Sequence, residues 1–377
     1  MGEICQITMG QSPNGNTYSD IPSDYILVQG NADLKNGWVC PRIWTSQMTK
    51  KADAGDLIMS VRAPAGEMGK TAYNVVIGRG VAAIKGNEFI YQLLVKMNGD
   101  GYWKSLSCGS TFESLNYNNI KNANVFVAKI LEQKKIGEYF SIIDHLITLS
   151  QRKIDKIKNL KKAMLEKMFP KKGSVIPEIR FNGFANAWEQ RKLGDIASSF
   201  EYGLNAVAKE YDGENKYIRI TDIDDNTHEF LTDNLTSPDI DLIGADNYKL
   251  TEGDILFART GASVGKSYIY RNSDGLVYYA GFLIRARIKE EYDAKFVFQN
   301  TLTDRYNKYI AVTSQRSGQP GVNAQEYAEF EIEVPKKEEQ TKIGTYFRNI
   351  DHLITLYQRK IDKIKNMKKA MLDQMFI

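Results

Sequence analysis

The sequence predicts an α+β protein in which two mixed α/β globular domains are joined by two long antiparallel coiled-coil helices, with a pseudo-two-fold relation between the halves. Three observations predict this class: a long segment occurs twice, each copy carries a single apolar seam, and short strand-like runs precede each copy. A length of 377 residues favours two or three domains. The expected order is globular domain 1 (1–134), first helix (135–169), linker (170–188), globular domain 2 (189–341) and second helix (342–377).

The repeated segment is the strongest signal in the chain. Residues 133–169 and 340–376 are identical at 29 of 37 positions, with a constant offset of 207. Two copies are too few for a solenoid, which needs at least three stacked units. The globular regions before the copies share only short echoes, such as Met1–Ile4 with Leu193–Ile196. This contrast indicates a shared role for the repeat and different roles for the globular domains.

Each copy of the repeat is expected to be a helix. Its apolar residues recur at steps of 3, 4 and 7, which is typical of one narrow helical seam and favours a coiled coil. No proline interrupts either copy, and Pro170 follows the first one. The nearest partner for each seam is the other copy, so the helices should pair antiparallel over roughly 50 Å. The predicted packing residues are Ile136, Phe140, Ile143, Ile147, Ile154 and Ile157 in the first copy, and Ile343, Phe347, Ile350, Ile354, Ile361 and Ile364 in the second.

The globular domains contain many short apolar runs separated by Gly, Asn and Asp, which is typical of strands and turns. A linker is expected at 171–187, where Gly173, Pro177 and Gly183 occur. The predicted strands are Tyr25–Gln29, Asp56–Arg62, Tyr217–Thr221, Asp254–Ala258, Lys266–Tyr270 and Glu329–Val334.

Several functional classes are disfavoured by what the chain does not contain. No apolar run reaches the roughly 18–20 residues of a membrane helix, and no secretory signal opens the chain. Three scattered cysteines predict neither a disulfide framework nor a metal site, and they fit a reducing cytoplasm. The stretch ending in Gly265-Lys266-Ser267 fails as a phosphate loop, because Thr260 stands where glycine is needed. With no catalytic motif found, the chain is predicted not to be an enzyme.

The net charge of +4 hides a strong segregation. Residues 151–172 and 358–377 carry +7 and +4, whereas residues 180–341 carry 19 basic and 27 acidic side chains, or −8. The basic helix ends could contact nucleic-acid phosphates or a protein surface, or simply form a solvated helix face. Any nucleic-acid contact in the globular domains would need local basic loops that present side chains able to read base edges. The candidates are Arg62 and Lys70 in the first domain, and Arg259, Thr260, Lys266, Arg285, Arg287, Gln315, Arg316 and Ser317 in the second.

The ordered set of motifs resembles the specificity subunit of Type I restriction–modification systems. The resemblance rests on Gly253–Lys266 and the looser Gly55–Lys70, on Val334–Gln340 leading into the second helix, and on Pro177–Phe181 running to Trp188–Leu193, in addition to the duplicated helix. The segment from about 177 to 191 has no counterpart before globular domain 1.

This resemblance implies a non-catalytic subunit with two target-recognition domains, each of which reads one half of a bipartite, asymmetric site in double-stranded DNA. The helices would set the spacer and dock two modification (methyltransferase) subunits, and restriction (translocase and nuclease) subunits would join them. S-adenosylmethionine, ATP and Mg²⁺ would bind to those partners, and this chain would hold no cofactor. The alternative is a two-lobed coiled-coil adaptor that binds only protein.

Overall fold

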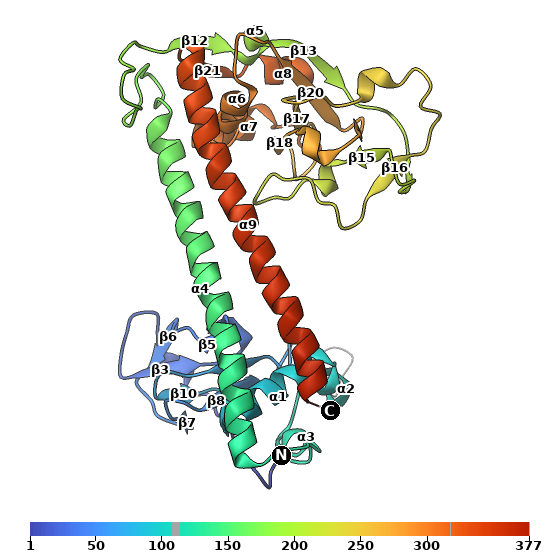
Figure 1. Ribbon diagram of the computed structural model, residues 1–377. Coiled ribbons are helices and arrows are strands. Elements are labelled where there is room, and N and C mark those ends of the chain that lie inside the picture. The colour runs from blue at the N-terminus through green and yellow to red at the C-terminus, as the bar shows by residue number, and fades with distance from the viewer. Residues whose placement is uncertain (108–113, 317, 377) are drawn as a thin grey trace. The chain divides into compact units, whose positions relative to one another are not determined.

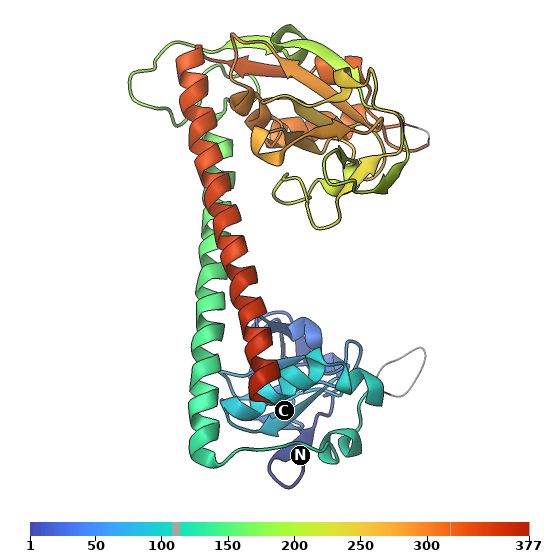
Figure 2. The ribbon, with the colours of Figure 1, turned by 45° about the vertical axis from the view of Figure 1, so that its right-hand side comes forward.

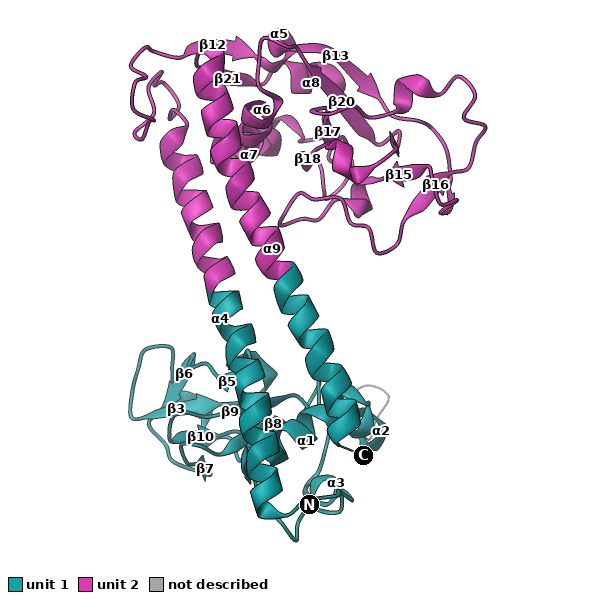
Figure 3. Cartoon of the chain, viewed as in Figure 1, with its two compact units in different colours: residues 1–152, 359–377 teal, residues 153–358 magenta. Residues whose placement is uncertain are grey.

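The computed structural model describes residues 1–107, 114–316 and 318–376. The chain forms two compact units, one made of 1–152 with 359–377 and the other of 153–358 (Figure 3). Each unit thus combines one globular domain with a segment of both long helices. The units are described separately below.

In its described residues, 1–107, 114–152 and 359–376, unit 1 contains two sheets and three short helices besides the long ones (Figure 1). One sheet has the order β1-β11-β8-β9-β5-β4 and the other the order β2-β6-β3-β10-β7. The strands of the first are Gln6–Met9, Val81–Lys85, Leu57–Ser60, Met68–Lys70, Trp38–Val39 and Leu34–Lys35 in that order. The strands of the second are Tyr18–Ser19, Ile43–Thr45, Tyr25–Val28, Val75–Ile77 and Lys51–Ala52. The helices are α1 (Glu88–Gly99), α2 (Tyr102–Leu106) and α3 (Tyr117–Lys121), and short 3₁₀ turns lie at Gly15–Thr17 and Asn31–Asp33.

Unit 2 repeats the central part of this plan with different surroundings. Its main sheet has the order β13-β20-β17-β18, and three two-stranded ribbons pair β12 with β21, β14 with β16, and β15 with β19. The main strands are Ala197–Tyr202, Leu283–Ile288, Ile255–Ala258 and Ser267–Ile269. The ribbons use Glu189–Lys192 with Glu331–Val334, Ala208–Glu210 with Thr236–Pro238, and Lys216–Ile218 with Val277–Tyr279. The short helices are α5 (Leu193–Ile196), α6 (Ala294–Asn300), α7 (Asp304–Thr313) and α8 (Ala324–Ala328), with 3₁₀ turns at Ile220–Asp222, Asp246–Tyr248 and Asn272–Asp274.

The two repeat copies form the long helices α4 (Ile130–Met168) and α9 (Lys337–Met375). Both begin five residues before the predicted helix starts at 135 and 342, and each is one continuous helix (Figure 2). In unit 1 Asp144 contacts Lys368, while the earlier Phe140 faces the later Phe376. In unit 2 Lys161 contacts Asp351, and the earlier Lys153 lies over the ring of the later Tyr357. In each unit the helices therefore run antiparallel, as predicted.

The predicted seam supplies the buried face of both helices. Nine of its twelve residues are buried, and Ile147, Ile157 and Ile364 are partly buried. The seam also has a partner that the sequence did not predict, because Ile136, Phe140 and Ile143 share one core with α1 residues such as Phe89. A small residue permits this close contact: a Cβ on Gly137 would lie 3.0 Å from the backbone nitrogen of Phe89. The seam therefore attaches each helix to its own globular domain as well as to its neighbour.

The two globular domains share a four-stranded antiparallel scaffold. Strands β1-β11-β8-β9 of unit 1 match β13-β20-β17-β18 of unit 2 in order and direction. The predicted strands all fall on observed ones, with one or two end residues trimmed in most cases. In the described part of the chain, no helix has the length and apolar character needed to cross a membrane.

Candidate nucleic-acid interface

One end of the scaffold sheet collects four of the eight candidate contact residues of unit 2. Arg259 directly follows β17, and Thr260 forms a bridge with Gly321. The backbone nitrogen of Gly261 donates to the oxygen of Pro320, at 3.0 Å. The loop that contains Gln315 and Arg316 is thereby fastened beside Arg259 and Thr260. The structure brings these four predicted residues together, while Ser317 lies outside the described residues.

Strand register changes the match between the two domains. Arg62 bridges Ser114 just as Thr260 bridges Gly321, so Arg62 is the structural equivalent of Thr260. Arg259 corresponds instead to the buried Val61, since their backbone nitrogens donate to Phe282 and Gly80 at the same place in the two sheets. A shift of one residue in a strand moves a side chain to the other face. The two sheet ends therefore present different side chains at equivalent positions.

The lysines of the two matching motifs have internal partners. The ammonium of Lys70 lies 2.9 Å from a carboxylate oxygen of Glu88, and its side chain is 13% exposed. It also faces the rings of Trp38 and Tyr91. Lys266 donates to the carbonyl oxygen of Ile223, at 3.0 Å. Both lysines thus hold loops of their own domain together, and their contact with nucleic acid stays an untested prediction.

Lys266 also pairs with Asp225 and is 10% exposed. By register it occupies the position of Glu67 in unit 1, since Ser60 and Ala258 donate their backbone nitrogens to the oxygens of Glu67 and Lys266. Lys70 and Lys266 are therefore not equivalent residues. The motif match fails here because Lys70 stands ten residues after Ser60, whereas Lys266 stands eight residues after the equivalent Ala258.

Arg285 and Arg287 were expected in a basic contact loop, and the structure contradicts this. Arg285 is 1% exposed and donates to the carbonyl oxygens of Asn247 and Lys249, at 2.8 and 3.1 Å. It also pairs with Glu201. Arg287 donates to Asp254, at 3.1 Å. Both lie in β20, where strand alternation places them on the same face toward these acceptors, although Arg287 near the strand end is still 41% exposed.

Arg316 is 42% exposed, and its guanidinium is held locally. It donates to the carbonyl oxygens of Thr313 and Gln315, at 2.7 and 3.0 Å, and pairs with Glu326. Gln315 is exposed. The loop therefore presents one glutamine freely to solvent and one arginine whose charge is partly compensated.

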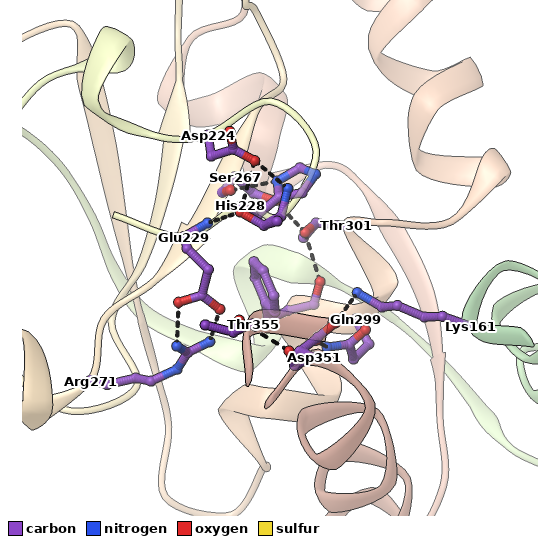
Figure 4. A network of polar contacts seen from close by, with 12 residues as sticks. Lys161, Asp224, His228, Glu229, Ser267, Arg271, Gln299, Thr301, Asp351 and Thr355 are labelled. Atoms are coloured by element: carbon purple, nitrogen blue, oxygen red, sulfur yellow. Dashed lines mark hydrogen bonds and ion pairs between the residues drawn. The ribbon is translucent and has the colours of Figure 1, made fainter. Parts of the chain in front are cut away.

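A polar junction missed by the sequence analysis joins each globular domain to both helices. In unit 2 Asp351 accepts from Gln299, at 3.3 Å, and pairs with Lys161, at 2.7 Å (Figure 4). In unit 1 Asp144 accepts from Gln92, at 2.7 Å, and pairs with Lys368, at 2.6 Å.

All three members of this junction recur at the 207-residue offset. Gln92 and Gln299 lie outside the near-identical segment, but the same offset relates them. The only nearby support is a phenylalanine three residues before each, at positions 89 and 296. Because the same three groups recur, both domains are attached to the helices in the same way.

A second network in unit 2 surrounds His228 (Figure 4). The His228 ring donates through Nδ1 to the carbonyl oxygen of Ser267, at 2.8 Å. The hydroxyls of Ser267 and Thr301 are 2.6 Å apart. Burial lowers the pKa of His228 below its ordinary value, against the opposing effect of the Ser267 carbonyl. With the ring neutral and tied to a carbonyl, His228 is best explained as a structural residue.

The basic end of α4 lines a cleft of about 820 Å³ in unit 2. Lys161 and Lys266 in its wall are paired with Asp351 and Asp225. Lys158 and Lys162 also line it and are exposed. These two lysines are the ones placed to meet an anion outside the protein.

The helices also carry exposed leucines at repeated positions. Leu146 and Leu149 of α4 are 45% and 46% exposed, and Leu353 and Leu356 of α9 are 43% and 45% exposed. We call these four residues the leucine stripe. Side chains of this size in the same place on both copies indicate a selected surface, since they lie off the packed seam.

The comparisons with known proteins agree with this architecture. The Type I restriction modification DNA specificity domain family matches residues 1–159 and 185–366. The MjaVIII specificity subunit of a type I restriction enzyme from Methanocaldococcus jannaschii is 22% identical over 75% of this chain and 67% of its own length. The MjaX specificity subunit of the same organism is 28% identical over 42% of this chain and 39% of its own length.

One solved structure reproduces the fold over the whole chain. The S subunit of the Type I restriction–modification system from M. genitalium superposes with a TM-score of 0.65, covering 100% of this chain and 94% of that one, at 14% identity. The family model accounts for both halves of the sequence, and the solved structure accounts for the arrangement of their elements. The chain therefore belongs to the Type I restriction modification DNA specificity domain family.

Proposed function

We propose that this chain is the specificity subunit of a Type I restriction–modification complex and that each globular domain reads one half of a bipartite, asymmetric DNA site. One observation carries the proposal: two equivalent sheet ends, on one shared scaffold, present different side chains. Unit 1 presents Arg62 where unit 2 presents Thr260. Differences of this kind are expected where two domains read different base sequences.

In this proposal, Arg62, Arg259, Thr260, Gln315 and Arg316 lie at the recognition ends of the two domains, while Lys158 and Lys162 contact phosphates. Arginine and glutamine can read base edges with paired hydrogen bonds, whereas lysines at the helix contribute affinity without sequence information. Lys70 and Lys266 act indirectly by holding the loops. The chain itself is non-catalytic and binds no cofactor.

Two modification subunits dock on the helices in this scheme, one in each unit. The leucine stripe supports such docking, because Leu146 with Leu149 and Leu353 with Leu356 offer two equivalent apolar faces. The modification subunits bind S-adenosylmethionine, and restriction subunits supply ATP- and Mg²⁺-dependent translocation and cleavage. The complex acts in the cytoplasm.

A domain exchange tests the reading model. Residues 1–134 are replaced by the corresponding domain of another family member, and adenine methylation is mapped by single-molecule sequencing of cellular DNA. One half of the methylated site should change while the other half stays the same. A change in both halves, or no dependence of methylation on this chain, contradicts the proposal.

A second experiment separates the proposal from the protein-only adaptor. Leu353→Glu places a charge on the stripe of unit 2 and should prevent one of two modification subunits from binding. Leu146→Glu should do the same in unit 1. A purified complex that assembles with modification subunits but shows no sequence preference in DNA binding would favour the adaptor.

A further inference from the structure

In unit 2 the predicted contact residue Arg259 and two aromatic side chains form a surface at the end of the main sheet. Phe282 precedes β20 and is 61% exposed, and Tyr202 ends β13 and is 43% exposed. Arg259, at the end of the neighbouring β17, lies between them, with its guanidinium 5.1 Å from the Tyr202 ring centre and 5.9 Å from that of Phe282. We call these three residues the aromatic–arginine patch.

The patch is held by the backbone of the sheet. The nitrogen of Arg259 donates to the carbonyl oxygen of Phe282, at 3.1 Å, and the nitrogen of Ala324 donates to the hydroxyl of Tyr202, at 3.2 Å. Side chains on strand ends keep a defined orientation better than those on free loops. These bonds fix the backbone of Phe282 and the ring of Tyr202, so less conformational freedom is left to lose when a partner binds.

The charge of Arg259 remains available on this surface. Among the described residues its guanidinium contacts the two rings, whereas Arg285, Arg287 and Arg316 each have a carboxylate partner. Aromatic rings flanked by an arginine are the usual platform on which proteins stack bases. The chemistry of the patch therefore fits a nucleobase beside a phosphate.

Electrostatics adds an independent reason. Residues 180–341 carry a net charge of −8, which repels DNA at long range. A domain of this charge needs a short-range contribution that does not depend on counterion release. Stacking is such a contribution.

We propose that Phe282 stacks on a nucleobase of the half-site that unit 2 reads, at a locally opened base step, with Arg259 and Tyr202 positioning the ring and the adjacent phosphate. This inference rests on the proposed function. It assigns Phe282 and Tyr202 to recognition, in addition to Arg259. Apolar side chains that enter base steps open them and bend the duplex, so the contact favours flexible steps.

Unit 1 cannot make the same contact. Gly80 holds the position of Phe282, since Val61 donates its backbone nitrogen to the oxygen of Gly80 as Arg259 does to that of Phe282. A Cβ at Gly80 would lie 1.9 Å from the backbone oxygen of Gln29. No side chain fits there, so the two half-sites should be read by different physical means.

The test compares Phe282→Leu with Phe282→Tyr in the complex with modification subunits. Leucine keeps an apolar side chain but has no ring face, whereas tyrosine keeps the ring. DNA affinity for the cognate site should fall about 5- to 100-fold with leucine and stay near wild type with tyrosine. The dependence of affinity on salt concentration should be the same for both variants, because no phosphate contact is removed.

The matched control is Phe126→Leu, which makes the same change at an exposed phenylalanine of unit 1 and should leave the affinity for DNA unchanged. Equal binding by Phe282→Leu and wild type overturns the stacking contact, as does a loss that tyrosine fails to restore. Weaker assembly of the subunits with unchanged DNA affinity also overturns it. If the wild-type complex shows no sequence preference at all, the proposed function itself fails.

Discussion

The beginnings of the two long helices differ far more than their sequences suggest. At the start of α9, strand β12 pairs with β21, and Arg180 donates to both carboxylate oxygens of Glu339, at 2.6 and 2.8 Å. At the start of α4 the residues before the helix form no strand, and Ile130 and Leu131 are 69% and 76% exposed. The start of α9 is therefore covered by the segment that contains Arg180 and β12, whereas the start of α4 is exposed.

This difference shows that the residues of the repeat determine the helix itself. The residues outside the repeat determine which segment packs against its start. The glutamines at the two starts behave identically: Gln133 donates to the oxygen of Ala128 and Gln340 to that of Pro335, both at 2.8 Å. The neighbouring glutamates differ from each other: Glu132 is exposed, whereas Glu339 is buried, with 1% of its side chain exposed. The predictions below use such equivalent pairs to test how far the two units behave alike.

The largest effect is expected where the units are most alike. Phe140 and Phe347 are equivalent by offset, and neither is exposed. Phe140→Ala and Phe347→Ala should each lower the free energy of unfolding of their own unit by about 3–5 kcal/mol, because each removes a fully buried ring. Hydrogen exchange measured by mass spectrometry across denaturant concentrations reports each unit separately. Equal acceleration of exchange in both units by one variant would show that they unfold as a single cooperative body.

A smaller effect should separate the two helix starts. Arg180→Ala leaves the buried Glu339 carboxylate without its partner and should cost about 2–3 kcal/mol, below the 3–5 kcal/mol of fully buried pairs because Arg180 keeps some contact with water. Glu132→Ala, at the equivalent of Glu339, should change stability by less than about 0.5 kcal/mol. Urea unfolding of the two variants measures the difference. Equal costs would show that the segment around Arg180 contributes nothing specific to unit 2.

The fold followed from the sequence because its main determinants are periodic. The 207-residue offset and the seam from Ile136 to Ile364 predicted both helices and their antiparallel pairing, and short apolar runs between turn residues predicted strands such as Asp254–Ala258. Periodicity reports which face of an element is buried. It does not report the partner, so the packing of Phe140 against α1 was not foreseen.

The candidate site was predicted less completely, because it depends on register. Arg62 and Arg259 are the arginines of two similar motifs, but strand pairing gives Arg62 the position that Thr260 has in unit 2. Arg285 was predicted to be a basic residue on the surface. It is buried, and it donates hydrogen bonds to the carbonyl oxygens of Asn247 and Lys249. Phe282 gave no signal, since an exposed phenylalanine in a strand-like run reads as a core residue. Such contacts depend on tertiary structure that a single sequence does not encode in its local pattern.

The pH dependence of stability should differ between the units. The pKa of His228 lies below its ordinary value of 6.5, chiefly because burial disfavours the charged ring. Below pH 6.5 the unfolded chain binds a proton at His228, whereas folded unit 2 disfavours it. The contribution of the neutral ring to the free energy of unfolding is therefore complete above pH 6.5 and is lost as the pH falls below it. His228→Asn, which tolerates the positive φ of 58° at this position, should flatten that loss between pH 7 and 5. His145→Asn, at an exposed site of unit 1, is the control, and identical pH profiles for wild type and His228→Asn would contradict the assignment.

The smallest effect on stability tests the uncovered helix start itself. Phe126 is 85% exposed, whereas the residue at the same offset in unit 2 is Glu333, which is buried and paired with Arg305. Phe126→Ser should therefore change stability by less than about 0.5 kcal/mol, while Glu333→Ser should cost more because Arg305 loses its partner. Removing Phe126 should also reduce self-association, since it removes one of three large exposed apolar side chains near the helix start, with Ile130 and Leu131 as the others. Light scattering over a range of protein concentrations measures this, and unchanged association would mean that the patch is not the surface through which copies of the chain adhere.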